Sequence, residues 1–429
     1  MHFQHLIRTC LGRLFTRANH FVLENKLPSL EKSLQGIDAL GLYLHIPFCR
    51  QICPYCPYNK ELYHPDTAKR YARAVKREID IYSDLVGQRP VTSFYIGGGT
   101  PTTMLHSGLE DILDHVFRSF NIQCDVHMES HPNDLSPDNL DVIAAMGVGH
   151  LSIGVEALQD HHLRTLDRPY TVNQVRTAIK GAVAKGFKCV NTDILFALPH
   201  QTNAELKQAA RALVEMDVGQ VAAYSIFTFP YTRWGQIVHQ EGYDKPGLLK
   251  RRRMLRVLEN IFYGAGFERT SVWAFTRPGV PKYSSAAVPL YVGLGASAGS
   301  YLRDVFYLNT FSVRAYIDSL ERGEMPIALS LDLSKELQMA GWLYWRIYET
   351  RFKKNDFTNR FGRPFDQVYG KHMKLLSLLG FLEHDGDDIV LSDDGSYWLH
   401  AVQDLFSIDY ISTLWGISQQ EPWPERVVL

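Results

Sequence analysis

The sequence predicts an α/β protein with a parallel β-sheet and a small C-terminal helical domain. The main observation is that strand-like and helix-like segments alternate from about residue 40 to residue 230. Such alternation folds into right-handed βαβ units, and their parallel strands form either an open sheet or a closed barrel. A second observation predicts the C-terminal domain, since residues 372–402 have the pattern of a helix, a β-hairpin and a helix.

Six strands are expected in chain order, at 42–46, 93–97, 125–130, 151–156, 189–196 and 221–227. Helices are expected between them at 65–86, 108–120, 136–147 and 171–186. Pro65 opens the first of these helices at a favourable first-turn position. The alternation becomes irregular after residue 230, and a helical region begins near residue 332.

Composition narrows the functional classes. The chain has 429 residues and a net charge of −1, so its charge gives no case for general nucleic-acid binding. No segment approaches the roughly 20 consecutive apolar residues that a membrane-spanning helix needs. Six cysteines, three of them clustered, do not resemble a disulfide framework, and they indicate a reducing cytoplasm.

The N-terminal 25 residues have apolar side chains at roughly helical spacing, with Arg8, Arg13 and Arg17 among them. The pattern predicts an amphipathic helix that packs on the main domain. The alternative is a basic helix that makes peripheral contact with a membrane surface through residues 1–25.

The clearest chemical motif is the loop that follows the first expected strand, where Cys49, Cys53 and Cys56 lie within eight positions. Functional groups of α/β folds gather at the carboxyl ends of the strands, so this loop is well placed for chemistry. A structural zinc site would need a fourth ligand such as His64. A redox pair would use Cys53 and Cys56 alone. An iron–sulfur cluster held by three thiolates would leave one iron open, and the spacing slightly favours this third interpretation.

Several stretches together resemble a known family. They are LYLHIPFCRQICPYC (42–56), YIGGGTPT (95–102), MESHP (128–132), SIGVEALQDHHLRTLDRPYT (152–171), NTDILFALPHQT (191–202) and YVGLGASAGS (291–300). On these motifs the chain is identified as a member of the radical S-adenosylmethionine (SAM) superfamily. It resembles the branch that contains oxygen-independent coproporphyrinogen dehydrogenase and a related heme chaperone, over about residues 40–400. The resemblance implies a partial (β/α)6 barrel of the TIM-like radical SAM type.

The resemblance also implies the cofactors. Cys49, Cys53 and Cys56 would be the catalytic ligands of a [4Fe–4S] cluster whose fourth iron binds SAM. Reduction by an electron donor such as flavodoxin or ferredoxin would cleave SAM to a 5′-deoxyadenosyl radical. Such a radical needs a site that excludes water and oxygen, which suits the interior of a capped barrel.

Residues at strand ends are implied to bind SAM, namely Tyr43, Gly97, Gly98, Gly99, Thr100, Glu129, Glu156, Arg168 and Asp193. The glycines lack Cβ atoms and let the backbone approach the ligand. Arg168 can hold a carboxylate, and Asp193 lies in an apolar stretch where a carboxylate needs a partner. Structural alternatives stay open for others, since Glu129 suits a solvated loop and Tyr43 suits core packing.

The predicted domains are an N-terminal amphipathic helical segment (1–38), a radical SAM partial barrel (39–230), a barrel extension with a second-site or substrate region (231–330), and a winged-helix-like helical lid (331–429). A second SAM is expected near Phe227, Phe229 and the 291–300 turn. Met104, His106 and the aromatic segment 341–352 are candidates for an apolar pocket that holds a planar substrate.

Departures from the family pattern direct the functional prediction. Tyr58 stands where the coproporphyrinogen enzyme has a further cysteine, and 281–295 lacks the histidine and tryptophan of the chaperone motif. The sequence resembles class C radical SAM methyltransferases more closely in 281–300. It therefore predicts methylation of an sp² carbon in a planar aromatic, quinone or tetrapyrrole, with two SAM molecules. The alternatives are a heme- or porphyrin-handling protein (heme chaperone, heme-degrading enzyme or coproporphyrinogen oxidase-like) and a binding module that keeps only its cluster.

Overall fold

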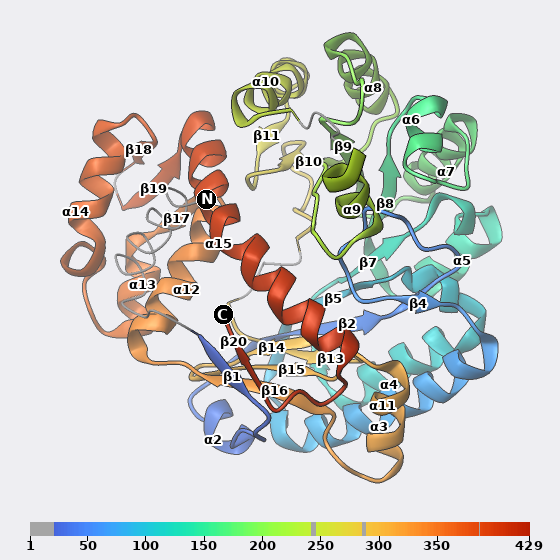
Figure 1. Cartoon of the computed structure of the whole chain (residues 1–429), viewed down its shortest axis with the longest axis vertical. Helices are drawn as coiled ribbons and strands as arrows, with labels where there is room; N and C mark the ends of the chain where they lie inside the picture. The colour runs from blue at the N-terminus through green and yellow to red at the C-terminus, as the bar shows by residue number, and fades with distance from the viewer. Residues whose placement is uncertain (1–20, 242–245, 285–288, 386) are drawn as a thin grey trace.

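Parallel strands form the centre of the protein, as the alternating pattern predicts. The computed structural model describes residues 21–241, 246–284, 289–385 and 387–429. Consecutive strands in the chain are neighbours in the sheet, all parallel: β2 (Leu40–Ile46), β5 (Pro90–Gly98), β7 (Val126–Ser130), β8 (Val148–Glu156), β9 (Cys189–Phe196) and β10 (Gln220–Ser225). All six predicted strands are therefore confirmed (Figure 1).

The sheet is larger than the sequence predicts. Beyond β2 it continues through β13 (Tyr291–Leu294), β14 (Gly299–Tyr301), β15 (Val305–Asn309), β16 (Ile327–Asp332), β1 (Val22–Glu24) and β20 (Arg426–Val428); beyond β10 it adds β12 (Ala274–Thr276) and β11 (Glu268–Arg269). Strand β13 is parallel to β2, and the strands after it are antiparallel to their neighbours. Within the described residues β11 and β20 are the two ends of the sheet, so the barrel is partial and open.

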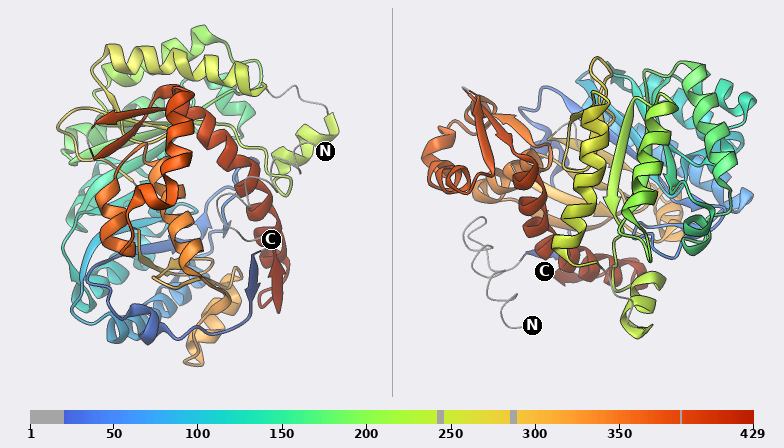
Figure 2. Two further views of the ribbon diagram at one scale, coloured as in Figure 1. Left: turned by 90° about the vertical axis from the view of Figure 1, so that its left-hand side faces the viewer. Right: turned by 90° about the horizontal axis from the view of Figure 1, so that it is seen from above.

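Helices cover the outside of the parallel strands (Figures 1 and 2). They are α3 (Pro65–Val86), α4 (Glu110–Ser119), α5 (Pro137–Ala145), α7 (Val172–Lys185), α8 (Asn203–Glu215), α10 (Leu248–Gly264) and α11 (Val313–Glu321). In α3, Tyr71, Val75 and Ile79 are completely buried and lie on one face at four-residue spacing. The four predicted helices are confirmed, with their ends within two residues of the expected ones.

Shorter elements connect these layers. They are α2 (Leu30–Leu34), β3 (Phe48–Cys49), β4 (Glu61–Leu62), η1 (Pro101–Met104), η2 (Leu105–Leu109), β6 (Asn121–Ile122), η3 (Pro132–Asp134), α6 (Asp160–Thr165) and α9 (Arg233–Glu241). Several of them follow the carboxyl ends of the parallel strands, where the candidate site lies.

The C-terminal region contains the predicted helix, hairpin and helix. Its elements are α12 (Lys335–Tyr348), β17 (Arg351–Lys353), α13 (Lys354–Phe361), α14 (Phe365–Leu378), β18 (Leu382–Asp385), β19 (Asp388–Leu391) and α15 (Asp393–Gln420). Strand β17 adds a third strand to the hairpin, in the order β17-β19-β18. Trp342 packs edge-on against Phe352 and Phe357, in a hydrophobic core separate from that of the main sheet.

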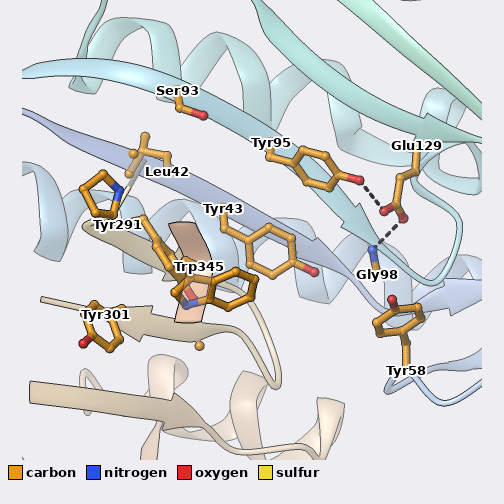
Figure 3. Close-up of a pocket in the computed structure, with 13 residues that line it drawn as sticks. Leu42, Tyr43, Tyr58, Ser93, Tyr95, Gly98, Glu129, Tyr291, Tyr301 and Trp345 are labelled. Atoms are coloured by element: carbon orange, nitrogen blue, oxygen red, sulfur yellow. Dashed lines mark hydrogen bonds between the residues drawn. The ribbon is translucent and has the colours of Figure 1, made fainter. Parts of the chain in front are cut away.

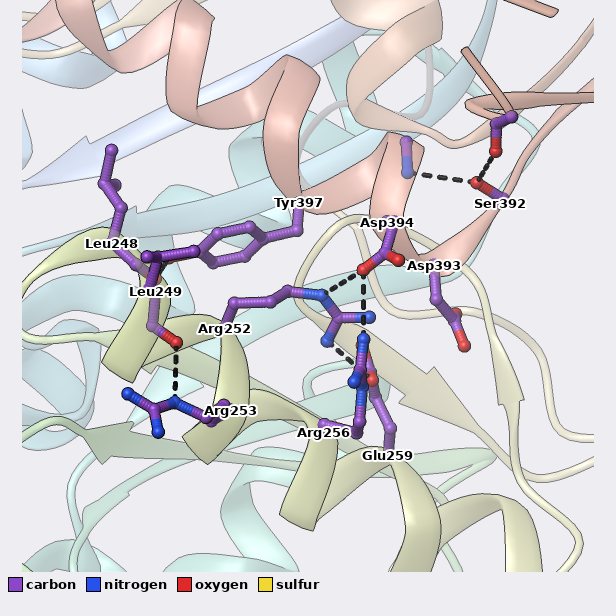
Figure 4. A network of polar contacts seen from close by, with 12 residues as sticks. Leu248, Leu249, Arg252, Arg253, Arg256, Glu259, Ser392, Asp393, Asp394 and Tyr397 are labelled. Carbon is purple, nitrogen blue, oxygen red and sulfur yellow. Dashed lines mark hydrogen bonds and ion pairs between the residues drawn. The ribbon is translucent and has the colours of Figure 1, made fainter. Parts of the chain in front are cut away.

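A buried ion-pair network joins the C-terminal region to the barrel (Figure 4). Arg252 of α10 donates from Nη1 to Glu259 at 2.8 Å and from Nε to Asp394 of α15 at 2.7 Å. Tyr397 of α15 donates to the Leu248 carbonyl at 2.7 Å. Because the Arg252 and Glu259 side chains are almost completely buried, loss of one partner would leave a buried charge uncompensated.

The N-terminal helix predicted over 1–38 lies largely outside the described residues. The prediction is wrong for residues 22–24, which form strand β1 and pair with β16 and β20. Their backbone donors and acceptors are satisfied by two neighbouring strands, which a helix would not permit. No helix among the described residues is long and apolar enough to cross a membrane. The domain boundaries and the membrane contact of residues 1–25 stay predictions.

Candidate active site

The cysteine loop begins where β2 ends. Cys49 ends β3, and β3 pairs in parallel with β4, which closes the loop at residues 61 and 62. Inside the loop, the Lys60 ammonium donates to the Cys56 carbonyl at 2.6 Å. From outside it, the Trp234 backbone amide donates to the Pro54 carbonyl at 2.9 Å, and the Tyr231 hydroxyl donates to the Pro57 carbonyl at 3.1 Å. The loop conformation is thus fixed by both the barrel and the segment after β10.

Cys49 is buried, and Cys53 and Cys56 are partly buried, in surroundings that suit metal ligation. Burial raises the pKa of Cys49 to about 12 and also raises the pKa of Cys56. A bound cation would reverse this effect, because metal coordination deprotonates a thiol outright. Arg168 donates from Nη1 to Cys53 Sγ at 3.0 Å, so positive charge already faces one sulfur.

The separation of the sulfurs distinguishes a cluster from a single ion. Ligands of one tetrahedral zinc ion lie about 3 to 4 Å apart, given metal–ligand bonds of 2.0–2.3 Å. Among the described residues, the group whose ligand atoms all lie within 4.8 Å of one another contains none of the three cysteines and not His64. A zinc site that uses these cysteines with His64 is therefore not preformed among the described residues.

The glycines at the end of β5 are explained by close contacts. A Cβ at Gly97 would lie 2.9 Å from Glu129 Oε1, and one at Gly99 would lie 3.0 Å from Cys49 Sγ. At Gly98 the backbone has a φ of +117°, and a Cβ would lie 2.6 Å from His45. The Thr100 hydroxyl reaches Cys49 Sγ at 3.5 Å. The predicted glycine segment therefore lies directly against the cysteine loop.

Two predicted carboxylates are partly buried on the inner side of the sheet. Glu129 accepts from the Tyr95 hydroxyl at 2.6 Å and from the Gly98 amide at 3.1 Å (Figure 3). Asp193 accepts from the Ser152 hydroxyl at 2.7 Å and from the Asn191 amide at 3.0 Å. Burial raises the pKa of each carboxyl to about 7. A cationic ligand beside them, such as the SAM ammonium or sulfonium, would stabilise the ionised form of both carboxyl groups.

The predicted pair Glu156 and Arg168 forms one polar unit at the end of β8. Their side chains approach to 3.8 Å, and Arg168 also donates to the Gly154 carbonyl at 3.0 Å and to the Tyr170 hydroxyl at 2.6 Å. Glu156 has a left-handed φ of +62°, which is uncommon for a residue other than glycine. Burial raises the pKa of Glu156, and the charge of Arg168 opposes that shift.

Tyr43 belongs to a relay that the sequence did not reveal. Its hydroxyl contacts His45 Nδ1 at 2.8 Å, and His45 Nε2 contacts the Asn59 carbonyl at 3.1 Å. Burial lowers the pKa of His45 to about 4, so the imidazole is neutral. This relay connects β2 to the cysteine loop. His45 lies two positions after Tyr43 on β2, and Tyr95 lies two positions before Gly97 on β5, so each pair shares a face of its strand. Period-two spacing alone does not separate functional from core positions.

A pocket of about 240 Å³ lies beside these residues. Figure 3 shows aromatic side chains along it, with Glu129 and Gly98 at one end. Its lining is Gly41, Leu42, Tyr43, Tyr58, Ser93, Tyr95, Gly98, Glu129, Pro289, Tyr291, Gly299, Tyr301 and Trp345. Tyr58 and Trp345 are 54% and 40% exposed, so the pocket opens to solvent beside the cysteine loop and α12.

Some of the residues expected near a substrate or second SAM line this pocket, and others do not. Tyr291 and Gly299 of the predicted 291–300 turn line it, and so does Trp345 of the aromatic segment, whereas Phe227 and Phe229 do not. Met104 is completely buried in the core. His106 contacts Asn139 at 2.9 Å instead.

Comparison with known proteins identifies the class. A family model described as the radical SAM superfamily matches residues 43–213. In fold, the chain matches the coproporphyrinogen III oxidase HemN of Escherichia coli, a radical SAM enzyme, with a TM-score of 0.76 over 90% of this chain and 94% of that one, at 20% identity. The protein therefore carries a radical SAM domain, and a [4Fe–4S] cluster and SAM are the cofactors of that family.

Sequence relatives place it within one branch. It is 25% identical to the heme chaperone HemW of Bacillus subtilis over 82% of this chain and 95% of the relative. It is 23% identical to the oxygen-independent coproporphyrinogen III oxidase of Bradyrhizobium diazoefficiens, over 86% of both chains. The protein thus carries a radical SAM domain and is similar over most of its length to proteins of the HemN and HemW branch. The individual roles of the predicted site residues stay predictions.

Proposed function

We propose that this radical SAM enzyme acts on a tetrapyrrole, which binds in the aromatic pocket beside the cysteine loop. The observation that carries the proposal is the position of that pocket, which has Glu129 and Gly98 at one end and is lined by five tyrosines and Trp345. Flat aromatic walls suit a planar, largely apolar ligand. The relatives given above are named for heme and coproporphyrinogen, and none is named a methyltransferase. We therefore prefer this alternative to the predicted methyl transfer.

Positive charge beside the pocket supports a tetrapyrrole with carboxylate side groups as the ligand. Arg346 follows Trp345 on α12, and its Nε and Nη2 are buried with no hydrogen-bond partner. Arg360 of α13 is near Tyr301, since its charge opposes the rise in the pKa of that phenol on burial. Burial and the nearby charge of Arg346 both lower the pKa of Arg360. A carboxylate side group of the ligand would relieve this repulsion by bidentate pairing.

The residues of the chain would prepare the site for radical chemistry. Cys49, Cys53 and Cys56 would hold the cluster, and Glu129, Glu156, Arg168 and Asp193 would hold SAM. When bound, the cluster and SAM would supply one-electron radical chemistry able to remove a hydrogen atom from the substrate. The glycines at the end of β5 bring the backbone close to the ligand, while Trp345 covers the opposite side of the pocket. In apo protein, Glu129 and Asp193 hold their protons up to a pH of about 7.

The test measures binding and turnover on the same anaerobically reconstituted full chain. Heme is titrated while the Soret band is recorded, and coproporphyrinogen III is added in parallel with dithionite and SAM. We expect one tetrapyrrole per chain and an increase in 5′-deoxyadenosine when the productive tetrapyrrole is present. Arg346→Gln should weaken binding about tenfold, whereas Arg322→Gln, an exposed arginine on another face paired with Glu324, should not.

The outcomes separate the alternatives. Binding of heme without stimulated SAM cleavage would favour a heme carrier. A rise in S-adenosylhomocysteine would favour methyl transfer. If neither tetrapyrrole binds nor changes the amount of 5′-deoxyadenosine, the proposal is wrong.

A further inference from the structure

A second group of metal-ligating side chains lies outside the candidate active site. His161 and His162 are in α6, and Glu205 is in the first turn of α8. Glu205 Oε1 is 3.0 Å from His161 Nε2 and 3.6 Å from His162 Nε2. The three ligand atoms all lie within 4.8 Å of one another, which sets this group apart among the described residues.

These separations match those around a small divalent ion. A zinc ion bound at 2.0–2.2 Å by imidazole nitrogen and carboxylate oxygen places its tetrahedral ligands roughly 3.3 Å apart. The two distances from Glu205 Oε1 lie on either side of that value. Two imidazoles and one carboxylate are borderline donors of the kind that zinc prefers.

His162 gives an independent indication of a ligand-binding site. Its side chain is 1% exposed, and neither ring nitrogen has a hydrogen-bond partner. A buried imidazole without such a partner is costly. Burial lowers its pKa, and the adjacent His161 adds to that effect.

The carboxylate is already oriented by its second oxygen. Glu205 Oε2 accepts from the backbone amide and the hydroxyl of Thr202, both at 2.8 Å, as part of a capping box. This leaves Oε1 directed at the two imidazoles. Such outer contacts commonly fix the ligands of metal sites. His161 is 55% exposed, so an ion and a completing water can enter from solvent.

We propose that His161, His162 and Glu205 bind a divalent transition-metal ion of the zinc class, separate from the iron–sulfur site. The ion would join the segment after β8 to the one after β9, where Gln159 already donates to the Glu205 carbonyl at 3.1 Å. Helix α6 leads directly to Arg168, whose backbone amide donates to the Leu163 carbonyl at 2.9 Å. The metal would thereby fix the segment that places Arg168 against Cys53.

The test is an anaerobic calorimetric titration of the cluster-loaded full chain with Zn²⁺. We expect one Zn²⁺ per chain with micromolar or tighter affinity, together with a higher melting temperature. His161→Ala should weaken binding at least tenfold. Glu205→Gln should do the same, although a glutamine preserves the capping box and hence the fold. His115→Ala is the matched control, because His115 forms a two-residue contact with Asp80 and has no third ligand.

X-ray absorption at the zinc edge identifies the ligands. Nitrogen and oxygen neighbours in the wild type, lost in Glu205→Gln, would support the site. Sulfur neighbours would place the ion on the cysteines and overturn the proposal. It would also be overturned by the absence of stoichiometric binding, by binding unchanged in both variants, or by an equal loss in His115→Ala.

Discussion

Gly98 is the residue at which the candidate site tolerates least change. Its φ of +117° is rarely adopted by residues other than glycine. A Cβ there would lie less than 3 Å from three atoms of the His45 ring. Its amide also donates to Glu129. Both backbone strain and side-chain overlap would therefore act on the relay that joins Tyr43, His45 and the cysteine loop.

Gly98→Ala should lower the free energy of unfolding by roughly 3 kcal/mol, since strain and overpacking each contribute 1–3 kcal/mol. Gly186→Ala is the matched control. Gly186 also has a positive φ, of +86°, in the left-handed αL region, but a Cβ there would meet no atom within 4 Å, so strain alone should cost roughly 1 kcal/mol. Urea unfolding of both variants measures the difference. Equal losses would show that the contact with His45 is unimportant.

Glu129 should make the stability of the apo protein depend on pH. Its pKa rises from 4.5 to about 7 on folding because the carboxyl is buried. The folded state therefore binds more protons than the unfolded state between these values, and stability falls as pH rises through that window. Glu129→Gln should remove this part of the decline, of the order of 2 kcal/mol between pH 5 and pH 8. Urea midpoints at both pH values test this, with the exposed Glu31→Gln as control; parallel profiles for all three proteins would refute it.

At the scale of elements, the period of the apolar pattern predicted the parallel strands and their helices well. It worked because β2 and α3 bury apolar residues at their characteristic spacings, as Tyr71, Val75 and Ile79 show. The short strands β1 and β20 have only three residues each, and their pairing is decided by partners distant in the chain. No local pattern could reveal them.

The candidate site was predictable where its motif has an unusual composition. The three cysteines, the three glycines and Arg168 were predicted, and the structure brings them together at one sheet edge. His45, Tyr95 and Tyr170 were missed, because a histidine or tyrosine within a strand or loop has no distinctive spacing. Their importance follows only from the partners that the fold supplies, such as Glu129 for Tyr95.

The segment after β10 should stabilise the cysteine loop. Tyr231→Phe removes the hydrogen bond to the Pro57 carbonyl, which is worth about 1 kcal/mol and corresponds to a roughly fivefold change in an equilibrium. We expect the reconstituted variant to release iron about fivefold faster to a ferrous chelator. Tyr82→Phe is the control, since its hydroxyl bonds Tyr307 in the core, away from the loop. A release rate equal to that of the control would contradict this role.

At the scale of the whole molecule, the two ends of the described chain meet on the main sheet. Strand β1 lies between β16 and β20, so the strands that carry Tyr291 and Tyr301 continue into the terminal ones. Helix α15 runs from the C-terminal domain back to this edge (Figures 1 and 2). Leu414 near its end packs with Leu23, Leu308 and Val427 in a small hydrophobic cluster. The C-terminal domain is thus attached to the barrel, for example through Arg252 and through Trp273, whose Nε1 donates to His400 at 3.0 Å, and also to the sheet at this cluster.

Val427→Asp should detach the C-terminal end of α15 from the main sheet. Val427 is 1% exposed and packs in that cluster, so an aspartate would be buried without a partner and should cost several kcal/mol. Val428→Asp is the matched control on the same strand, because Val428 is 49% exposed on the opposite face and should change stability by less than about 0.5 kcal/mol. Urea unfolding gives the two values, and limited proteolysis should show faster cleavage within α15 for Val427→Asp alone. Equal behaviour of the two variants would mean that β20 does not hold the end of α15. The C-terminal domain would then be held by its contacts with the barrel, such as those of Arg252 and Trp273.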